Sequence, residues 1–116
     1  MSFNPQRLQL DTAFAHIDKG NYEAAAPVLR RFAEQGDIDA QYQLAFMLEH
    51  GLGVKIDLEG AVHWYAKAAE QGDLAAQFNL AECLEDGVGT AQDYVQAAFW
   101  YAKAAEQGDV DAQNQL

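Results

Sequence analysis

Histidine and cysteine bind zinc, and cysteine beside a base can act as a nucleophile, but this sequence spaces them for neither role. The three histidines, His16, His50 and His63, show neither an HExxH pair nor another paired spacing of zinc ligands. Cys83 is the only cysteine, so it forms no disulfide within the chain, and no base can be assigned to it. We expect Cys83 to pack as a small apolar residue, with no metal site, no cofactor and no enzymatic activity.

Two glycine pairs superficially resemble the loops that bind nucleotide phosphates. Gly51 and Gly53 are separated by one residue, as are Gly87 and Gly89. Phosphate-binding loops follow a strand and open a helix, whereas these pairs follow helical patterns and recur at a fixed interval. We therefore interpret the glycines as structural.

Charge and hydropathy exclude further classes of function. Seven Lys and Arg against eighteen Asp and Glu give a net charge of −11, and in residues 68–116 Lys103 is the only basic residue. Nucleic acids and anionic membrane surfaces attract clustered positive charge, so we expect neither as a partner. The first residues lack the apolar stretch of a signal peptide, and no apolar run would span a membrane, so the sequence predicts a cytoplasmic protein.

An internal repeat of 36 residues organises the chain. Residues 41–76 and 77–112 are identical at 20 of 36 positions, including WYAKAAEQGD at 64–73 and again at 100–109. A third copy is visible upstream, because AEQGDIDAQ ends at residue 41, one period before AEQGDLAAQ. Periods of this size indicate stacked supersecondary units, each of which buries its apolar face against its neighbours.

Each unit is predicted to be a pair of antiparallel helices, and no segment alternates as a strand does. Within one unit, Gly51 ends the first helix, Asp57 caps the second helix, and Gly72 ends it. By the same pattern, Gly108 ends the last full hairpin and a further helix begins after it. Acids at the expected N-cap positions are Asp37, Asp57, Asp73, Asp93 and Asp109.

The recurring residues resemble the Sel-one-like repeat, a 36-residue relative of the tetratricopeptide repeat. The matching positions in the first complete copy are Leu44, Ala45, Leu48, Gly51, Gly53, Val54, Asp57, Ala61, Trp64, Tyr65, Lys67 and Gly72. The second copy departs at Thr90, where the family prefers valine. The resemblance implies an all-α fold, an α/α superhelix (solenoid) of helical hairpins, which holds partner proteins and does not catalyse a reaction.

We expect residues 1–116 to form a single α-solenoid domain. Its expected units are a tetratricopeptide-like lead-in over about residues 6–40, Sel-one-like repeats over 41–76 and 77–112, and the start of a further helix over 113–116. The last full hairpin lacks the modified sequence that usually caps a solenoid. Either the natural chain continues, or this end pairs with a second copy in a homodimer or with another partner.

In such arrays the first helix of each hairpin usually lines the concave surface. The face opposite the core stripe of residues 44 and 48 carries Asp39, Tyr42, Gln43, Phe46 and His50. The equivalent positions one repeat later are Ala75, Phe78, Asn79, Glu82 and Asp86. Glu85 completes an acidic cluster with the last two of these. We predict that this surface binds a protein or peptide, with basic character favoured by the acids.

Structural alternatives exist for several of these residues. Phe46 packs on a neighbouring helix in the alternative interpretation, and the acidic cluster is then a solvated helix face. Trp64 and Trp100 recur in both copies, which favours packing over binding. At the level of the whole protein, the sequence predicts a protein-binding adaptor. The alternatives are an inhibitor or immunity-type protein that masks a basic partner, or a structural fragment of a longer repeat scaffold.

Overall fold

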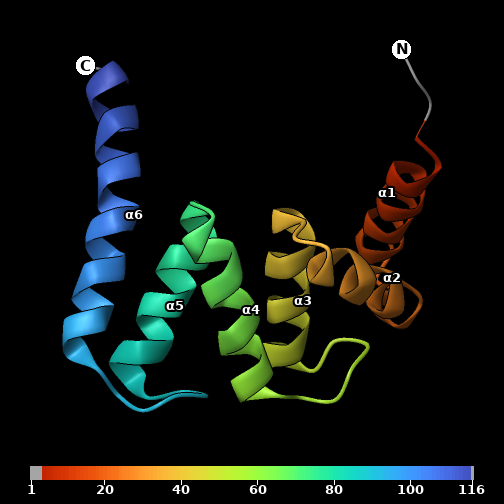
Figure 1. Ribbon diagram of the computed structural model, residues 1–116, viewed down its shortest axis with the longest axis horizontal. Coiled ribbons are helices and arrows are strands. Elements are labelled where there is room, and N and C mark those ends of the chain that lie inside the picture. Colours follow the sequence, from red (N-terminus) through yellow and green to blue (C-terminus); the bar gives the residue numbers. More distant parts are fainter. Residues whose placement is uncertain (1–3, 116) are drawn as a thin grey trace.

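The computed structural model describes residues 4–115, with the side chains of residues 4–108. Its helices are α1 (Pro5–Asp18), α2 (Tyr22–Glu34), α3 (Ile38–His50), α4 (Leu58–Glu70), α5 (Leu74–Asp86) and α6 (Tyr94–Gln115). Each helix packs against its neighbours in sequence, so the hairpins form a row (Figure 1). The predicted all-α array of helical hairpins is confirmed.

Short local signals set where the helices begin. The side chain of Asp37 accepts a hydrogen bond from the Ala40 amide at 2.8 Å, and Asp73 accepts one from the Ala76 amide at the same distance. Such N-caps satisfy amides that have no partner within the helix. Asp57 and Asp93 cap α4 and α6 in the same way. The capping roles predicted for these four aspartates are therefore confirmed.

Alanines and leucines of neighbouring helices form one continuous core. The largest fully buried side chains are Tyr65, Leu10, Leu29, Leu44 and Met47. Trp64 and Trp100 are half-buried and pack against this core, as the packing interpretation predicted. The many small residues at the helix contacts allow the helices to approach closely.

A pair of glutamines joins each hairpin to the next. Gln77 is 5% exposed, and its Nε2 donates to the Ala69 carbonyl at 3.2 Å. Its Oε1 accepts from Gln107 Nε2 at 2.9 Å. The junction one repeat earlier has the same bonds, with Gln41 in place of Gln77 and Gln71 in place of Gln107. The amides of Gln41 and Gln77 are buried and fix the register between hairpins, because a shift would leave them without partners.

Close backbone contacts also join the hairpins. Gly53 and Gly89 have φ values of 71° and 74° and lie at equivalent places in the loops after α3 and α5. A Cβ on Gly53 would lie 2.5 Å from the carbonyl carbon of Tyr22, where α2 begins. A Cβ on Gly89 would clash with the carbonyl oxygen of Leu58, where α4 begins. Both positions therefore require glycine.

The predicted helix end at Gly108 is wrong. At Gly72 the backbone turns with a φ of 98°, whereas α6 continues through Gly108 to Gln115. The turn at Gly72 is stabilised because the 13 residues of α5 pack on α4. Residues 109–115 supply only about two helical turns, and glycine continues a helix at a cost of about 1 kcal/mol.

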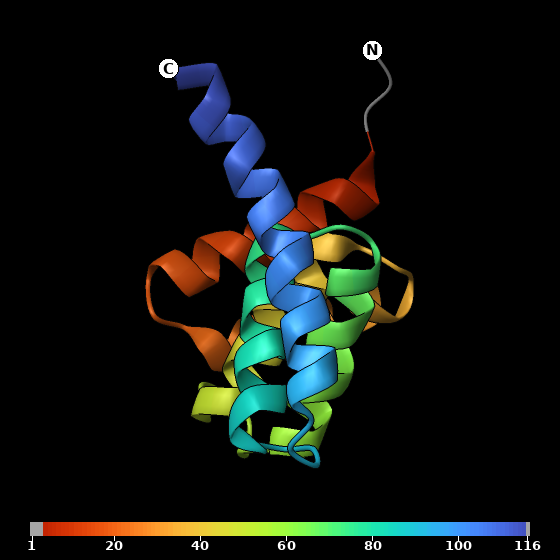
Figure 2. The same ribbon diagram turned by 90° about the vertical axis from the view of Figure 1, so that its left-hand side faces the viewer.

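The further helix expected over 113–116 is therefore not separate, since residues 113–115 belong to α6. The predicted cap by the Asp109 side chain, and Leu116 itself, lie outside the described part of the chain. The last turns of α6 extend past the N-terminal end of α5 in both views (Figures 1 and 2).

Within residues 4–115, no helix combines the length and the apolar character needed to cross a membrane.

Candidate protein-binding surface

The first helices of the three hairpins together line one hollow, which we name the groove. It has a volume of about 320 Å³. Its lining residues are Arg7 and Phe14 of α1, Asp39, Tyr42 and Gln43 of α3, and Asp73 and Ala75 at the start of α5. Three of the residues predicted to bind a partner therefore lie together here.

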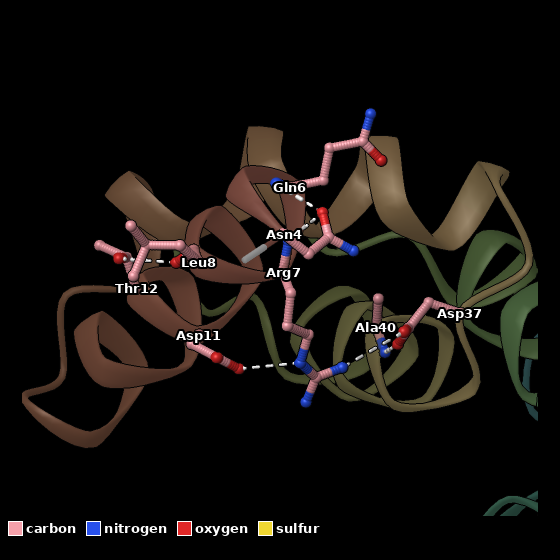
Figure 3. Close-up of polar contacts among 8 residues, drawn as sticks. All are labelled: Asn4, Gln6, Arg7, Leu8, Asp11, Thr12, Asp37 and Ala40. Carbon is pink, nitrogen blue, oxygen red and sulfur yellow. Dashed lines mark hydrogen bonds and ion pairs between the residues drawn. The ribbon is translucent and has the colours of Figure 1, made fainter. Parts of the chain in front are cut away.

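Arg7 links the two N-terminal hairpins at the edge of the groove (Figure 3). Its guanidinium lies 3.1 Å from the Asp11 carboxylate and 4.0 Å from the Asp37 carboxylate, which also caps α3. Exposed ion pairs of this kind stabilise a fold only weakly, so their main effect is to orient the side chain. The sequence did not identify Arg7 or Phe14, because the lead-in has no close copy that would fix its helical register.

Tyr42 of the groove bonds to Asn79, which lies on the first helix of the next hairpin. The Nδ2 of Asn79 donates to the Tyr42 hydroxyl at 3.4 Å, and the Tyr42 ring lies 5.8 Å from the ring of Tyr65. The buried Tyr65 hydroxyl donates to Glu49 at 3.0 Å. Burial, followed by the charge of Glu49, raises the pKa of Tyr65 well above its ordinary value. These contacts hold two predicted site residues, on the first helices of successive hairpins, in fixed positions.

A larger hollow, which we name the C-terminal pocket, adjoins the groove. It has a volume of about 760 Å³. Its lining residues are Asp73, Leu74, Ala75, Phe78 and Asn79 of α5, and Tyr101, Ala104 and Ala105 of α6. The rings of Phe78 and Tyr101 meet edge to face at 5.3 Å, and Phe78 remains 48% exposed. Because Asp73 and Ala75 line both hollows, the two form a continuous surface.

The acidic cluster predicted in α5 lies outside both hollows. Glu82, Glu85 and Asp86 are exposed. Partial burial, followed by the Glu85 carboxylate, raises the pKa of Tyr101 to about 12. Glu85 is the counterpart of Glu49 one repeat later, and its charge acts on Tyr101 as that of Glu49 acts on Tyr65. The other two acids of the cluster are free to act on a ligand through their field.

Phe46 and His50 form a separate aromatic pair at the C-terminal end of α3. Their ring centroids are 4.4 Å apart, and His50 Nε2 lies 3.2 Å from Glu49. Phe46 is half-buried, and neither residue lines the groove or the C-terminal pocket. The structure therefore does not bring these two predicted residues together with Tyr42 and Gln43.

The side chain of Cys83 packs in the core. It is 4% exposed, one repeat after the fully buried Met47. Burial, followed by the charge of Glu49, raises the pKa of the Cys83 thiol to about 11. The thiol is consequently protonated at neutral pH, which suits packing and not nucleophilic attack. Among the described residues, no three His, Cys, Asp or Glu side chains gather as metal ligands would.

Solved structures of other proteins contain the same array. A Sel1 repeat protein from Oxalobacter formigenes is 40% identical, with a TM-score of 0.79 over 84% of this chain and 40% of that one. Protein c5321, a protective antigen of uropathogenic Escherichia coli with an SLR fold, is 33% identical, with a TM-score of 0.84 over 95% of this chain and 24% of that one. This chain therefore spans less than half the length of either protein.

A more distant structure shares the fold alone. Helicobacter pylori cysteine rich protein B is 24% identical, with a TM-score of 0.75 over 90% of this chain and 80% of that one. No curated protein matches the sequence. The family model of the Sel1 repeat matches residues 38–73 and 74–109, which contain the hairpin of α3 and α4 and most of the hairpin of α5 and α6. The chain therefore belongs to the Sel1 repeat (SLR) family of helical repeat proteins.

Proposed function

We propose that this protein is a non-catalytic scaffold that binds a segment of a partner protein or peptide along its concave face. The observation that carries the proposal is the continuous surface formed by the groove and the C-terminal pocket. Five residues selected from the sequence line it: Asp39, Tyr42, Gln43, Phe78 and Asn79. Sel1 repeats typically mediate protein interactions, which supports a binding role.

The lining favours a segment with apolar and basic side chains. Phe78 and Leu74 are 48% and 40% exposed, so each offers apolar area that a ligand would remove from water. Asp39 and Asp73 contribute acidic groups to the groove, and the whole chain carries a net charge of −11. We expect the apolar contacts to supply most of the affinity and the acids to speed the encounter.

An inhibitor of a basic protein is a special case of the same binding mode. The acids at the surface would then mask positive charge on the partner, which is the inhibitor or immunity-type alternative given by the sequence. This version predicts that the partner's own activity falls when the complex forms. In the fragment alternative, the same face belongs to a longer scaffold and the partner also contacts repeats beyond these.

Two exposed phenylalanines provide a matched test of the binding face. Phe78 lines the C-terminal pocket, whereas Phe99, which is 52% exposed, lines neither that pocket nor the groove. Partners captured from a lysate of the source cells would be purified and titrated by calorimetry. We expect Phe78→Ala to weaken binding by at least about tenfold, because buried aromatic anchors dominate interfaces. Phe99→Ala should leave the affinity within about twofold.

Salt and charge substitutions test the electrostatic part. The double variant Glu82→Gln, Asp86→Asn should slow association several-fold at low salt, and the wild-type rate should fall as salt rises. A double variant of exposed acids elsewhere, Glu59→Gln, Glu106→Gln, is the control for the net charge. Equal effects of the two phenylalanine variants, or binding that is indifferent to salt, would contradict the proposal.

A further inference from the structure

The C-terminal pocket repeats a surface that a helix covers in the preceding hairpin. One repeat earlier, the counterparts of its α6 lining are Tyr65, Ala68 and Ala69, which are 0%, 0% and 1% exposed. They are buried where α5 packs on α4, and Gln77 of α5 donates to the Ala69 carbonyl. In the last hairpin, Tyr101 still borders an open hollow. The pocket is therefore the site at which the first helix of a following hairpin would pack. We call such a site a seat, and no described residue occupies this one.

Two helices already occupy such seats, α3 against α2 and α5 against α4. Each begins with a capping aspartate, followed by a buried alanine and a buried glutamine. These residues are Asp37, Ala40 and Gln41 in α3, and Asp73, Ala76 and Gln77 in α5. The glutamine donates to a carbonyl eight residues earlier, which sets the register of the seated helix.

Residues 109–116 have the sequence of a seated helix. They read Asp-Val-Asp-Ala-Gln-Asn-Gln-Leu, and residues 37–44 read Asp-Ile-Asp-Ala-Gln-Tyr-Gln-Leu. Six of the eight positions are identical, including the capping aspartate, the alanine and the glutamine. In the structure α6 is one helix as far as Gln115, so this segment continues past the start of α5 and does not fold back onto its own chain (Figures 1 and 2).

The pairing of seated helices has a symmetry that two straight α6 helices reproduce. Where α4 of one hairpin packs on α5 of the next, Ala69 pairs with Gln77, so this antiparallel pair of helices is centred on residue 73. The same pairing of Ala105 with Gln113 is centred on residue 109. Two antiparallel copies of α6 that cross at residue 109 make this pairing twice. Ala105 of each copy then lies opposite Gln113 of the other, and a two-fold axis relates the two pairs. The exchange needs no change in the backbone of α6.

We propose that the C-terminal pocket binds residues 109–116 of a second copy of this chain, in a reciprocal exchange. Gln113 of one copy donates to the Ala105 carbonyl of the other, as Gln77 does to Ala69 within one chain. The exchanged segments cover Tyr101 and Phe78 in both copies. A partner that binds through Phe78 therefore competes with the exchange.

The dependence on salt distinguishes this exchange from the proposed binding of a partner, on which the competition at Phe78 rests. Each copy carries a net charge of −11, so two copies repel each other and salt weakens that repulsion. Self-association should therefore strengthen as salt rises, whereas binding of a basic partner should weaken. Either proposal can fail without the other.

Sedimentation equilibrium of the full chain, over a range of concentrations at high salt, tests the exchange. We expect a reversible monomer–dimer equilibrium. Ala112→Lys should raise the dissociation constant by at least about a hundredfold, because it places an unpaired charge at a buried contact twice per dimer. Asp111→Lys is the control, since the counterparts Asp39 and Ala75 are exposed, and it should not weaken the dimer. A strict monomer, or equal weakening by both variants, would overturn the proposal.

Contacts within the dimer identify the occupant of the pocket. A sample that mixes isotope-labelled and unlabelled chains should show filtered NOEs between the Tyr101 ring of one copy and Gln115 of the other. Asn79, the counterpart of Gln115, affects the pKa of Tyr65 and donates to the hydroxyl of Tyr42, whose ring lies 5.8 Å from that of Tyr65. The same NOEs within a single chain would show a segment folded back at Gly108 and would overturn the exchange. A dimer without these NOEs would place the interface elsewhere and would also overturn it.

Discussion

The same ten residues adopt different structures in the two complete repeats. At 64–73 they end a helix, turn at Gly72 with a φ of 98° and cap α5 through Asp73. At 100–109 they continue as one helix. Because the local sequence is identical, the difference comes from what packs on each copy. A following helix of 13 residues covers the first copy, and the described residues place no such helix on the second.

The exposure of the two tyrosines in these copies shows the consequence. Tyr65 is completely buried under α5, whereas Tyr101 borders the C-terminal pocket. Positions that face the preceding hairpin, such as Gly53 and Gly89, have the same environment in both repeats. Positions that face the following hairpin, such as Tyr65 and Tyr101, have different environments in the two repeats. An array of near-identical repeats therefore acquires an open surface at its end from residues that are core elsewhere.

The largest expected effect is on the free energy of unfolding when each of the two tyrosines is replaced. Tyr65→Ala should lower the free energy of unfolding by about 3–5 kcal/mol, because it empties a fully buried site. Tyr101→Ala should lower it by about 1 kcal/mol, because one side of the ring already faces solvent. Urea unfolding at concentrations where the protein is monomeric measures both. Equal losses would contradict the difference between the two repeats.

The two loop glycines should instead behave alike. Gly53→Ala and Gly89→Ala should each cost about 2 kcal/mol or more, because the left-handed conformation and the close backbone contact both disfavour a Cβ. The same unfolding experiment measures them. A large difference between these two variants would show that the contact with the preceding hairpin is not equivalent in the two repeats.

The dependence of stability on alkaline pH should also distinguish the two tyrosines. The folded state raises the pKa of Tyr65, so above pH 10 the unfolded chain loses a proton that the folded chain keeps. The free energy of unfolding therefore falls as the pH rises, by up to about 1.4 kcal/mol per pH unit for one proton. In Tyr65→Phe the free energy of unfolding should fall less steeply with pH throughout the range above pH 10, because the contribution of one titrating proton is missing.

Tyr101→Phe is the comparison for this experiment. Because the pKa of Tyr101 is about 12, its contribution to the slope is confined to the interval between pH 10 and about 12. Unfolding curves measured at several alkaline pH values test both variants. Identical slopes for the wild type and Tyr65→Phe would contradict the burial of the Tyr65 hydroxyl.

The smallest effects should distinguish structural from surface acids. Glu49→Gln should cost about 1 kcal/mol, because it weakens the hydrogen bond that the Tyr65 hydroxyl donates. Glu82→Gln should change stability by less than about 0.5 kcal/mol, since its side chain is exposed. Thermal unfolding resolves the pair. A loss for Glu82→Gln as large as that for Glu49→Gln would assign this acid a structural contact.

The fold was predictable wherever the signal is local. Aspartates 37, 57, 73 and 93 cap helices through amides three residues away, so short-range pattern alone locates these starts. The end at Gly108 was not predictable, because glycine permits a turn but only the packing of a following helix stabilises one.

The binding surface was predictable only in part, for a related reason. A helical wheel groups Asp39, Tyr42 and Gln43 correctly, because they share one helix. It cannot show that Phe14 and Tyr101 line the same surface, since these residues come from other helices. The offset of 36 residues between Glu49 and Glu85 was a missed signal, because an acid that recurs with the repeat suggests a structural partner.

Hydroxyl-radical footprinting of the dilute, monomeric protein tests the central claim most directly, because it reads the exposure of both tyrosines in one sample. Tyr94, which is 66% exposed, gives the upper reference for the rate of modification. The structure predicts that Tyr101 is modified much faster than Tyr65, and the proposed function predicts that a bound partner slows the modification of Tyr101 and not that of Tyr65. Equal modification of Tyr65 and Tyr101, with or without the partner, would contradict the assignment of a buried core in one repeat and an open, candidate binding surface in the other.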